Sequence, residues 1–208
     1  MVSEGEAFDW LGKPLEFGER PAIVVIDVQY GMTDPEHPVG AELSDMVKQI
    51  NRVLLVAREN AVPVVFTVIS YPEGNPGVFG EKAPELATFT PDSRWTDLDA
   101  RLNVGDEDPI VVEKRHQSAF FETELDALLR DWDVDTLVVV GCSTSGCVRA
   151  TVTDANALGY PTFIPTEAVS DRSYEQHRSN LVDMDQKLAD VLPIDVVLRS
   201  LEMTTHED

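Results

Sequence analysis

The feature that most constrains this chain is an apolar run that leads through a few small residues directly into a helical pattern. Residues 136–159 read TLVVVGCSTSGCVRATVTDANALG. The run from Leu137 to Val140 is typical of a strand buried on both faces, and the apolar spacing after it predicts a helix. Cys147 then stands at the helix start and at the carboxyl end of a parallel strand, where open α/β sheets bind ligands. Backbone N–H groups and the helix dipole are expected to lower the pKa of this thiol, although a lone cysteine is more often an inert core residue.

Strands and helices alternate along the rest of the chain. The expected strands are 21–27, 62–69, 110–113, 137–140, 162–164 and 195–198, and the expected helices are 43–60 with Ser44 as its cap, 122–132, one that starts at Cys147, and 174–191. Residues 29–35 are expected to form a loop. This alternation predicts an α/β fold, a three-layer α/β/α sandwich around a central six-stranded parallel sheet.

The 208 residues, 43% of them hydrophobic, are enough for one core, and we expect a single domain over 1–208. Glycines and prolines break every periodicity in 70–108, so this irregular insertion is expected to act near the site as a lid or binding loop, with Trp95 lining a pocket or plugging the loop to the core. Residues 1–20 are expected to form an irregular N-terminal arm. Its large apolar side chains, expected to pack on the body or on another subunit, are Phe8, Trp10, Leu11 and Phe17.

Acidic side chains outnumber basic ones by 38 to 16, which gives a formal charge of −22. Nucleic acid and anionic membranes would repel such a chain, so we expect a small-molecule partner instead. The sequence has no apolar stretch of membrane-spanning length, and its first residues, MVSEGEAFDW, lack the pattern of a signal peptide. A cytoplasmic location is therefore expected.

The two cysteines, Cys142 and Cys147, are four residues apart, and a cytosolic setting makes a disulfide between them improbable. Zinc needs four ligands, but no second cysteine pair is present and the four histidines are dispersed. We therefore expect neither a metal nor a cofactor.

Three chemically distinct residues stand at the carboxyl ends of predicted strands: Asp27, Lys114 and Cys147. Taken singly, Asp27 reads as a turn residue and Lys114 as a surface lysine. Because parallel strands end at one edge of the sheet, the three are expected to converge. Together they supply a nucleophile, a carboxylate that takes its proton and a cation that stabilises the thiolate. His116 is the competing base, although it lies further from its strand end.

The segments AIVVIDVQYGMTDP, VVEKRHQSAFFET and VVVGCSTSGCVRATVTDANALGY resemble the three signature regions of the isochorismatase-like cysteine hydrolase superfamily, over residues 21–190. Within it, GCSTSGCVRAT followed by AVSDRS is most similar to the N-carbamoylsarcosine amidases. The resemblance implies that Asp27, Lys114 and Cys147 are the catalytic triad. It also implies a cis peptide bond between Cys142 and Ser143, and an oxyanion hole formed by the backbone N–H groups of Ser143 and Cys147.

The implied reaction is hydrolysis of a small amide through a thioester or thiocarbamate, with release of ammonia. By the same resemblance Arg172 would bind a substrate carboxylate. The alternative is a structural role, in which Arg172 forms an ion pair with Asp171 or Glu175. Further candidates for substrate contact are the hydroxyls of Thr144 and Ser118 and an aromatic wall from Phe120 or Phe121.

Other branches of the superfamily fit less well. The nicotinamidases carry a D-x-H type metal site after the second strand, where this chain reads SYPEGNPG, and the isochorismate-cleaving branch lacks the cysteine. The alternatives that stay open are a maleamate-type or ureidoacrylate-type hydrolase and a non-catalytic, thiol-bearing binding module. Members of the superfamily commonly form homo-oligomers, so we expect a dimer or tetramer, in which a neighbouring subunit could complete the pocket.

The acidic side chains are scattered rather than gathered in a tail, which is the pattern of a surface adapted to high salt. Screening by salt would weaken the repulsion among these charges. We therefore predict that the melting temperature rises as KCl is raised to molar concentration. Equal melting temperatures at low and molar KCl would contradict a high-salt adaptation.

Overall fold

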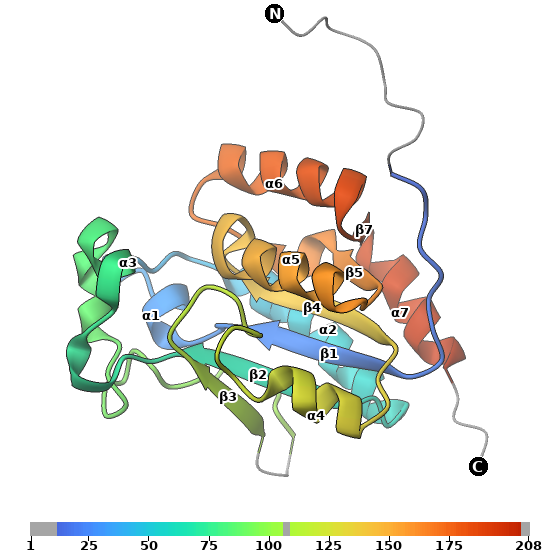
Figure 1. Cartoon of the computed structure of the whole chain (residues 1–208), viewed down its shortest axis with the longest axis horizontal. Helices are drawn as coiled ribbons and strands as arrows, with labels where there is room; N and C mark the ends of the chain where they lie inside the picture. The colour runs from blue at the N-terminus through green and yellow to red at the C-terminus, as the bar shows by residue number, and fades with distance from the viewer. Residues whose placement is uncertain (1–11, 106–108, 205–208) are drawn as a thin grey trace, which may run out of the picture.

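The computed structural model describes residues 12–105 and 109–204. Its parallel sheet has the order β3-β2-β1-β4-β5-β7, with the short strand β6 paired to the end of β4, and confirms the predicted α/β/α fold class (Figure 1). The strands are β1 (Pro21–Ile26), β2 (Val64–Ile69), β3 (Ile110–Lys114), β4 (Thr136–Cys142), β5 (Thr162–Pro165), β6 (Val169–Ser170) and β7 (Asp190–Leu192). The main helices are α1 (Tyr30–Thr33), α2 (Ser44–Glu59), α3 (Gly77–Lys82), α4 (Leu125–Asp131), α5 (Arg149–Leu158), α6 (Tyr174–Lys187) and α7 (Ile194–Met203).

The two central strands, β1 and β4, are buried along their whole length. Their sequences, PAIVVI and TLVVVGC, are rich in β-branched residues, which fit a strand that is covered on both faces. They pair in register from Pro21 opposite Thr136 to Ile26 opposite Gly141, so both strands end at the same level of the sheet. The residues that follow each strand are thereby brought to one edge.

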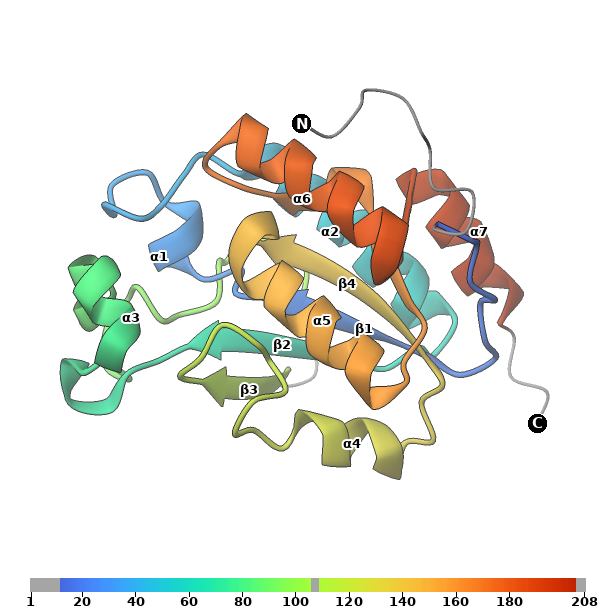
Figure 2. The same cartoon turned by 45° about the horizontal axis from the view of Figure 1, so that its top comes forward.

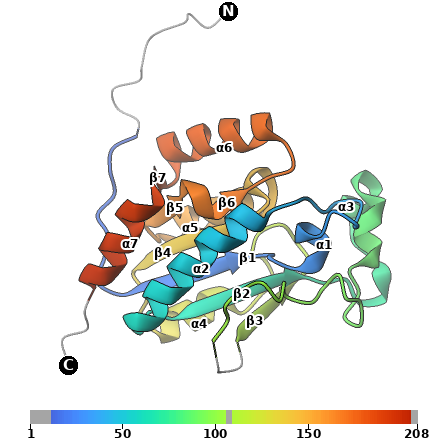
Figure 3. The same ribbon diagram turned by 180° about the vertical axis from the view of Figure 1, so that it is seen from behind.

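Helices cover both faces of the sheet. Side chains of α2 and α7 belong to one core cluster, and side chains of α4, α5 and α6 belong to the other. The view from behind shows α2 and α7 crossing the sheet on their own side (Figure 3). On the opposite side α6 lies along α5, above the end of β4 (Figure 2).

The predicted strand at 195–198 is wrong, because these residues lie inside α7. The buried residues there, Ile194, Val197, Leu198 and Leu201, recur every three or four positions, which is the period of a helix. The sixth strand in the sheet order is β7 instead. It follows α6, which ends at Lys187 and not at residue 191 as predicted.

Two local predictions about helix starts are also wrong. Ser44 begins α2 rather than capping it, and its hydroxyl donates to the Glu42 carboxylate. The helix expected at Cys147 begins as regular α-helix only at Arg149, after a π-helical turn, η3 (Thr144–Val148). The expected loop 29–35 contains the single helical turn α1.

The insertion 70–108 holds only short helices in its described part: η1 (Pro72–Gly74), α3 and η2 (Pro84–Thr88). Its last part is hydrogen-bonded to the segment after β1, since Asp99 N–H donates to Val28 and Gly31 N–H donates to Trp95. The Trp95 ring packs on the hydrophobic core and against the His37 ring, with centroids 4.8 Å apart. It therefore anchors the insertion to the rest of the domain. The insertion therefore stands beside the carboxyl end of β1.

The arm packs on the body where it is described. The Phe17 ring contacts the Phe163 ring at a centroid distance of 4.7 Å, and Gly18 N–H donates to the Thr136 hydroxyl. Phe8, Trp10 and Leu11 lie outside the described residues. No helix within 12–105 or 109–204 has the length and apolar character needed to cross a membrane.

Candidate active site

The carboxyl ends of three strands bring the predicted site residues together. Asp27 directly follows β1, Lys114 is the last residue of β3, and the η3 turn with Cys147 follows β4. In the sheet β1 neighbours β4 on one side and β2 on the other, and β2 neighbours β3. The structure therefore places at one edge the three residues that the sequence predicted to converge.

Asp27 is held in a fixed orientation inside the protein. It is 0% exposed, and its backbone φ of 48° lies in the left-handed region, which an aspartate tolerates better than most residues. Its Oδ1 accepts a hydrogen bond from the Thr67 hydroxyl at 2.7 Å, and its backbone N–H donates to Thr67. Its other oxygen, Oδ2, is left to face the rest of the site.

Lys114 supplies the positive charge next to that oxygen. Its Nζ lies 2.8 Å from Asp27 Oδ2, with both side chains fully buried, and donates to the backbone carbonyls of His116 and Gln117 at 3.0 and 3.1 Å. Burial opposes the charge on the ammonium, but the Asp27 carboxylate raises the pKa of Lys114 above its ordinary value. Lys114 is thus a permanent cation.

Cys147 is only 5% exposed and lies near both of these side chains. Both Asp27 and Lys114 are near enough to affect its sulfur through charge and hydrogen bonding. Burial, reinforced by the negative charge of Asp27, raises the pKa of the Cys147 thiol to about 12, against the opposing effect of Lys114. The expected lowering of this pKa is therefore wrong: the resting site holds a protonated thiol.

The turn that carries Cys147 has an unusual backbone. The peptide bond between Cys142 and Ser143 is cis, as the resemblance implied. The N–H groups of Gly146 and Val148 both donate to the Ser143 carbonyl, which in a regular α-helix would accept from Cys147. Because its two neighbours take that carbonyl, the Cys147 N–H is not directed to it.

Two residues near α6 hold the turn from outside. Asp171 Oδ2 accepts the Ser145 N–H at 2.7 Å, and His177 Nδ1 lies 2.8 Å from the Thr144 hydroxyl. Burial lowers the pKa of His177, so a neutral imidazole is favoured there. The Thr144 hydroxyl, predicted to contact substrate, is buried and directed to His177.

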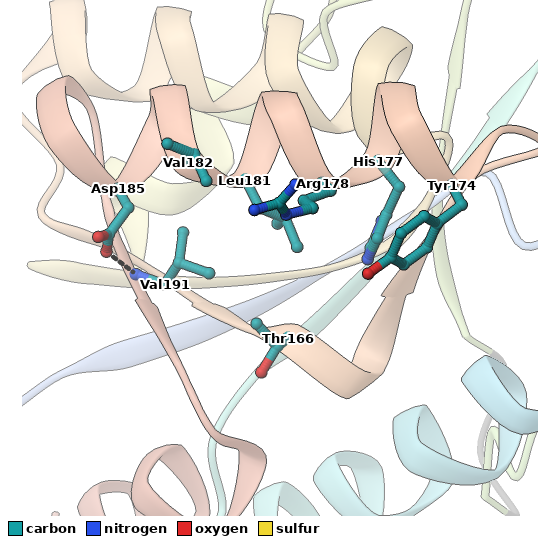
Figure 4. Close-up of a pocket in the computed structure, with 8 residues that line it drawn as sticks. All are labelled: Thr166, Tyr174, His177, Arg178, Leu181, Val182, Asp185 and Val191. Carbon is teal, nitrogen blue, oxygen red and sulfur yellow. Dashed lines mark hydrogen bonds between the residues drawn. The ribbon is translucent and has the colours of Figure 1, made fainter. Parts of the chain in front are cut away.

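His177 also lines a groove of about 350 Å³ between α6 and the segment around β7. In Figure 4 His177 and Tyr174 extend from α6 toward Thr166, while Asp185 accepts the Val191 N–H at the other end. Because Cys147 is not among its lining residues, the groove adjoins the turn that carries Cys147 without opening onto the sulfur.

Arg172 follows β6, whose Ser170 pairs with Cys142, so it lies beside the cysteine turn. It is exposed, and its guanidinium donates to the Val39 carbonyl at 2.9 Å. The Asp171 carboxylate accepts a hydrogen bond from the backbone N–H of Arg172 and not from the Arg172 side chain. Within the described part of the chain the guanidinium makes no ion pair. The alternative expectation, an ion pair with Asp171 or Glu175, is therefore not observed.

The loop after β3 holds the other predicted contacts. Phe120 is buried in the core cluster that also contains Cys147 and stacks on Tyr160 at 6.0 Å, whereas Phe121 is exposed. The Ser118 hydroxyl is buried and accepts the Phe120 N–H. The imidazole of His116, the competing base, is directed to the Glu122 carboxylate at 3.2 Å and not to the thiol.

The sequence analysis missed Ser70 and Tyr71, which directly follow β2 between the ends that carry Asp27 and Lys114. Both are buried, and neither hydroxyl has a hydrogen-bond partner among the described residues. The signal that could have found them is the one that found Asp27: a polar residue at the carboxyl end of a buried strand.

Comparisons with known proteins agree with this fold. A family model described as isochorismatase domain matches residues 21–195. N-carbamoylsarcosine amidase from an Arthrobacter species is 34% identical over 194 residues, covering 89% of this chain and 73% of the relative. Maleamate amidohydrolase from Pseudomonas putida is 37% identical over 188 residues, covering 87% of this chain and 86% of the relative. The crystal structure of a cysteine hydrolase from Pseudomonas syringae has the same fold, with a TM-score of 0.86 and 23% identity over 93% of this chain and 98% of that one.

The raised pKa of Cys147 gives a direct prediction. A thiol whose pKa lies at about 12 stays protonated far above neutrality, whereas an unperturbed cysteine with a pKa of about 8.5 ionises near pH 8 to 9. The thiolate absorbance in the ultraviolet, measured as the difference between the native chain and Cys147→Ala, should therefore stay flat from about pH 6 to pH 10. The same difference in denaturant should titrate near the ordinary value. A native thiolate signal at pH 7 would contradict the neutral resting thiol.

Proposed function

The chain belongs to the isochorismatase family, and on that premise we propose that it is a cysteine amidohydrolase that releases ammonia from a small carboxylated amide or N-carbamoyl compound. The observation that carries the proposal is the buried arrangement of a thiol, a carboxylate and an ammonium at one edge of the sheet. A redox-sensitive thiol would need only a shifted pKa. A buried carboxylate with one oxygen facing the sulfur is what proton transfer during an attack requires.

The first half of the reaction begins from a neutral thiol. Asp27 takes the proton of Cys147 as the sulfur attacks the amide carbonyl, and Lys114 keeps the carboxylate in place. The backbone N–H groups of Ser143 and Cys147 stabilise the oxyanion that develops on the carbonyl oxygen. The carbon–nitrogen bond then breaks, the nitrogen takes the proton from Asp27, and ammonia leaves a thioester or thiocarbamate on the sulfur.

Water completes the reaction from the side that ammonia has left. Asp27 accepts a proton from this water as its oxygen attacks the acyl carbon, the same two N–H groups hold the second oxyanion, and the sulfur recovers its proton as the acid departs. Asp27 thus acts as base and acid in both halves. The Asp27 carboxylate is near enough to interact with a thiol that does not ionise by itself, which supports this role.

Arg172 is proposed to bind the substrate carboxylate. Its exposed guanidinium lies beside the cysteine turn and donates only to a backbone carbonyl, so its charge is available. In a chain with a net charge of −22, one cation at the mouth of the site draws in an anionic substrate. The Arthrobacter and P. putida relatives are named for carbamoylsarcosine and for maleamate, and both names fit an amide that carries a carboxylate.

A panel of carboxylated primary amides and N-carbamoyl acids, assayed for ammonia release, tests the activity. We predict that the native chain hydrolyses at least one member and that Cys147→Ala lowers the rate by about a thousandfold or more, because the covalent step is lost. Cys147→Ser is the matched variant with nearly the same shape and should be inactive at an unchanged melting temperature. Full activity in Cys147→Ala would contradict the cysteine mechanism, and no ammonia from any member would leave the binding-module alternative.

The role of Arg172 is tested separately. Arg172→Ala should lower kcat/KM for carboxylated amides about 10- to 100-fold, because a charge-assisted hydrogen bond to the carboxylate is lost, and should leave uncharged amides nearly unaffected. Arg130→Ala, which removes an arginine from the surface of α4, is the control. An unchanged preference for charged over neutral amides would remove Arg172 from the binding role.

A further inference from the structure

Two buried hydroxyls, those of Ser70 and Tyr71, have no hydrogen-bond partner within the described residues. Beside them Asp27 Oδ2 makes no regular hydrogen bond there, although Lys114 Nζ lies 2.8 Å away as its ion-pair partner. Polar groups in protein interiors are nearly always paired, since leaving a buried donor or acceptor unpaired is unfavourable. Such atoms in unrelated places would suggest accidents of packing. These three atoms lie together.

The sheet explains why they are together. Ser70 and Tyr71 follow β2, which lies between β1 with Asp27 and β3 with Lys114. The Ser70 N–H donates to the Lys114 carbonyl at 2.9 Å, and the Tyr71 N–H donates to the Phe89 carbonyl. The backbone is therefore fixed on both sides, and the two hydroxyls are positioned by the strand end and by the insertion rather than by partners of their own.

Tyr71 is a buried phenol beside the reacting groups, with only 1% of its surface exposed. Burial, together with the negative charge of Asp27, raises the pKa of Tyr71 well above its ordinary value. The phenol is therefore neutral at every working pH, with one O–H to donate and oxygen lone pairs to accept.

We propose that Tyr71 is a further substrate-contacting residue, whose hydroxyl acts with Asp27 Oδ2 to bind the unsubstituted NH2 group of the scissile amide. The proposal deepens the amidohydrolase assignment and rests on it. A primary amide nitrogen carries two N–H donors, and these two oxygens can each accept one.

The same pair of oxygens suits each later species at this position. When the carbon–nitrogen bond breaks, the nitrogen takes its proton from Asp27, and Tyr71 keeps its own proton throughout. Water then replaces ammonia and also has two O–H donors for the two acceptors. Ser70 lines a cavity of about 320 Å³ together with Lys114 and His116, although Asp27 and Tyr71 are not among its lining residues.

Tyr71→Phe removes the hydroxyl and keeps the buried ring. We expect kcat/KM for the best primary amide of the panel to fall about tenfold, as the loss of one hydrogen bond to substrate predicts. The melting temperature should stay unchanged or rise, because an unpaired buried hydroxyl is removed. Tyr160→Phe is the matched control: it deletes a buried phenol whose hydroxyl does have a partner, Asp126, and should lower the melting temperature at unchanged kcat/KM.

A comparison of leaving groups separates substrate contact from general damage. The methyl ester of the same acid has no N–H to bind, so Tyr71→Phe should lower kcat/KM for the ester much less than for the amide. Equal losses on ester and amide, a lower melting temperature or an unchanged amide kcat/KM would each overturn the role of Tyr71 while leaving the amidohydrolase in place. Absence of ammonia release by the native chain would overturn the proposed function itself, and the role of Tyr71 with it.

Discussion

The ion pair between Asp27 and Lys114 is the interaction on which the rest of the site depends. Both side chains are fully buried at 2.8 Å, and removing two charges from water costs several kcal/mol each, which their attraction offsets only in good geometry. The Thr67 hydroxyl on Asp27 and two backbone carbonyls on Lys114 complete that geometry. A pair of apolar residues would often give a protein equal stability, so function is the better reason for two charges in this core.

Burial has a second consequence, which acts on the sulfur. The pair already balances one negative and one positive charge, so ionising Cys147 would add an uncompensated charge to an enclosed site. Desolvation and the negative charge of Asp27 therefore outweigh the opposing effect of Lys114. In the proposed reaction we therefore expect proton transfer to Asp27 and attack by the sulfur to occur together, so that the reactive anion forms only when an electrophile is present.

The sequence predicted the parts of this picture that follow from strand order. Buried apolar runs located most of the strands, and the shared edge of a parallel sheet was enough to predict that Asp27, Lys114 and Cys147 meet. The strand at 195–198 failed because three consecutive apolar residues, 196–198, fit either a strand or a buried helix, and only packing decides between them. The thiol pKa failed because it depends on burial, which the local pattern around Cys147 does not encode.

Tyr71 shows what such an argument leaves out. A polar residue at a strand end is ordinary, and only the surrounding structure reveals that its hydroxyl is enclosed without a partner. An unpaired buried hydroxyl and a left-handed Asp27 both work against the stability of the resting protein. In the proposed reaction these features become favourable once an amide supplies the missing donor, because a site that is complementary to the reacting state has to be poorly satisfied without it.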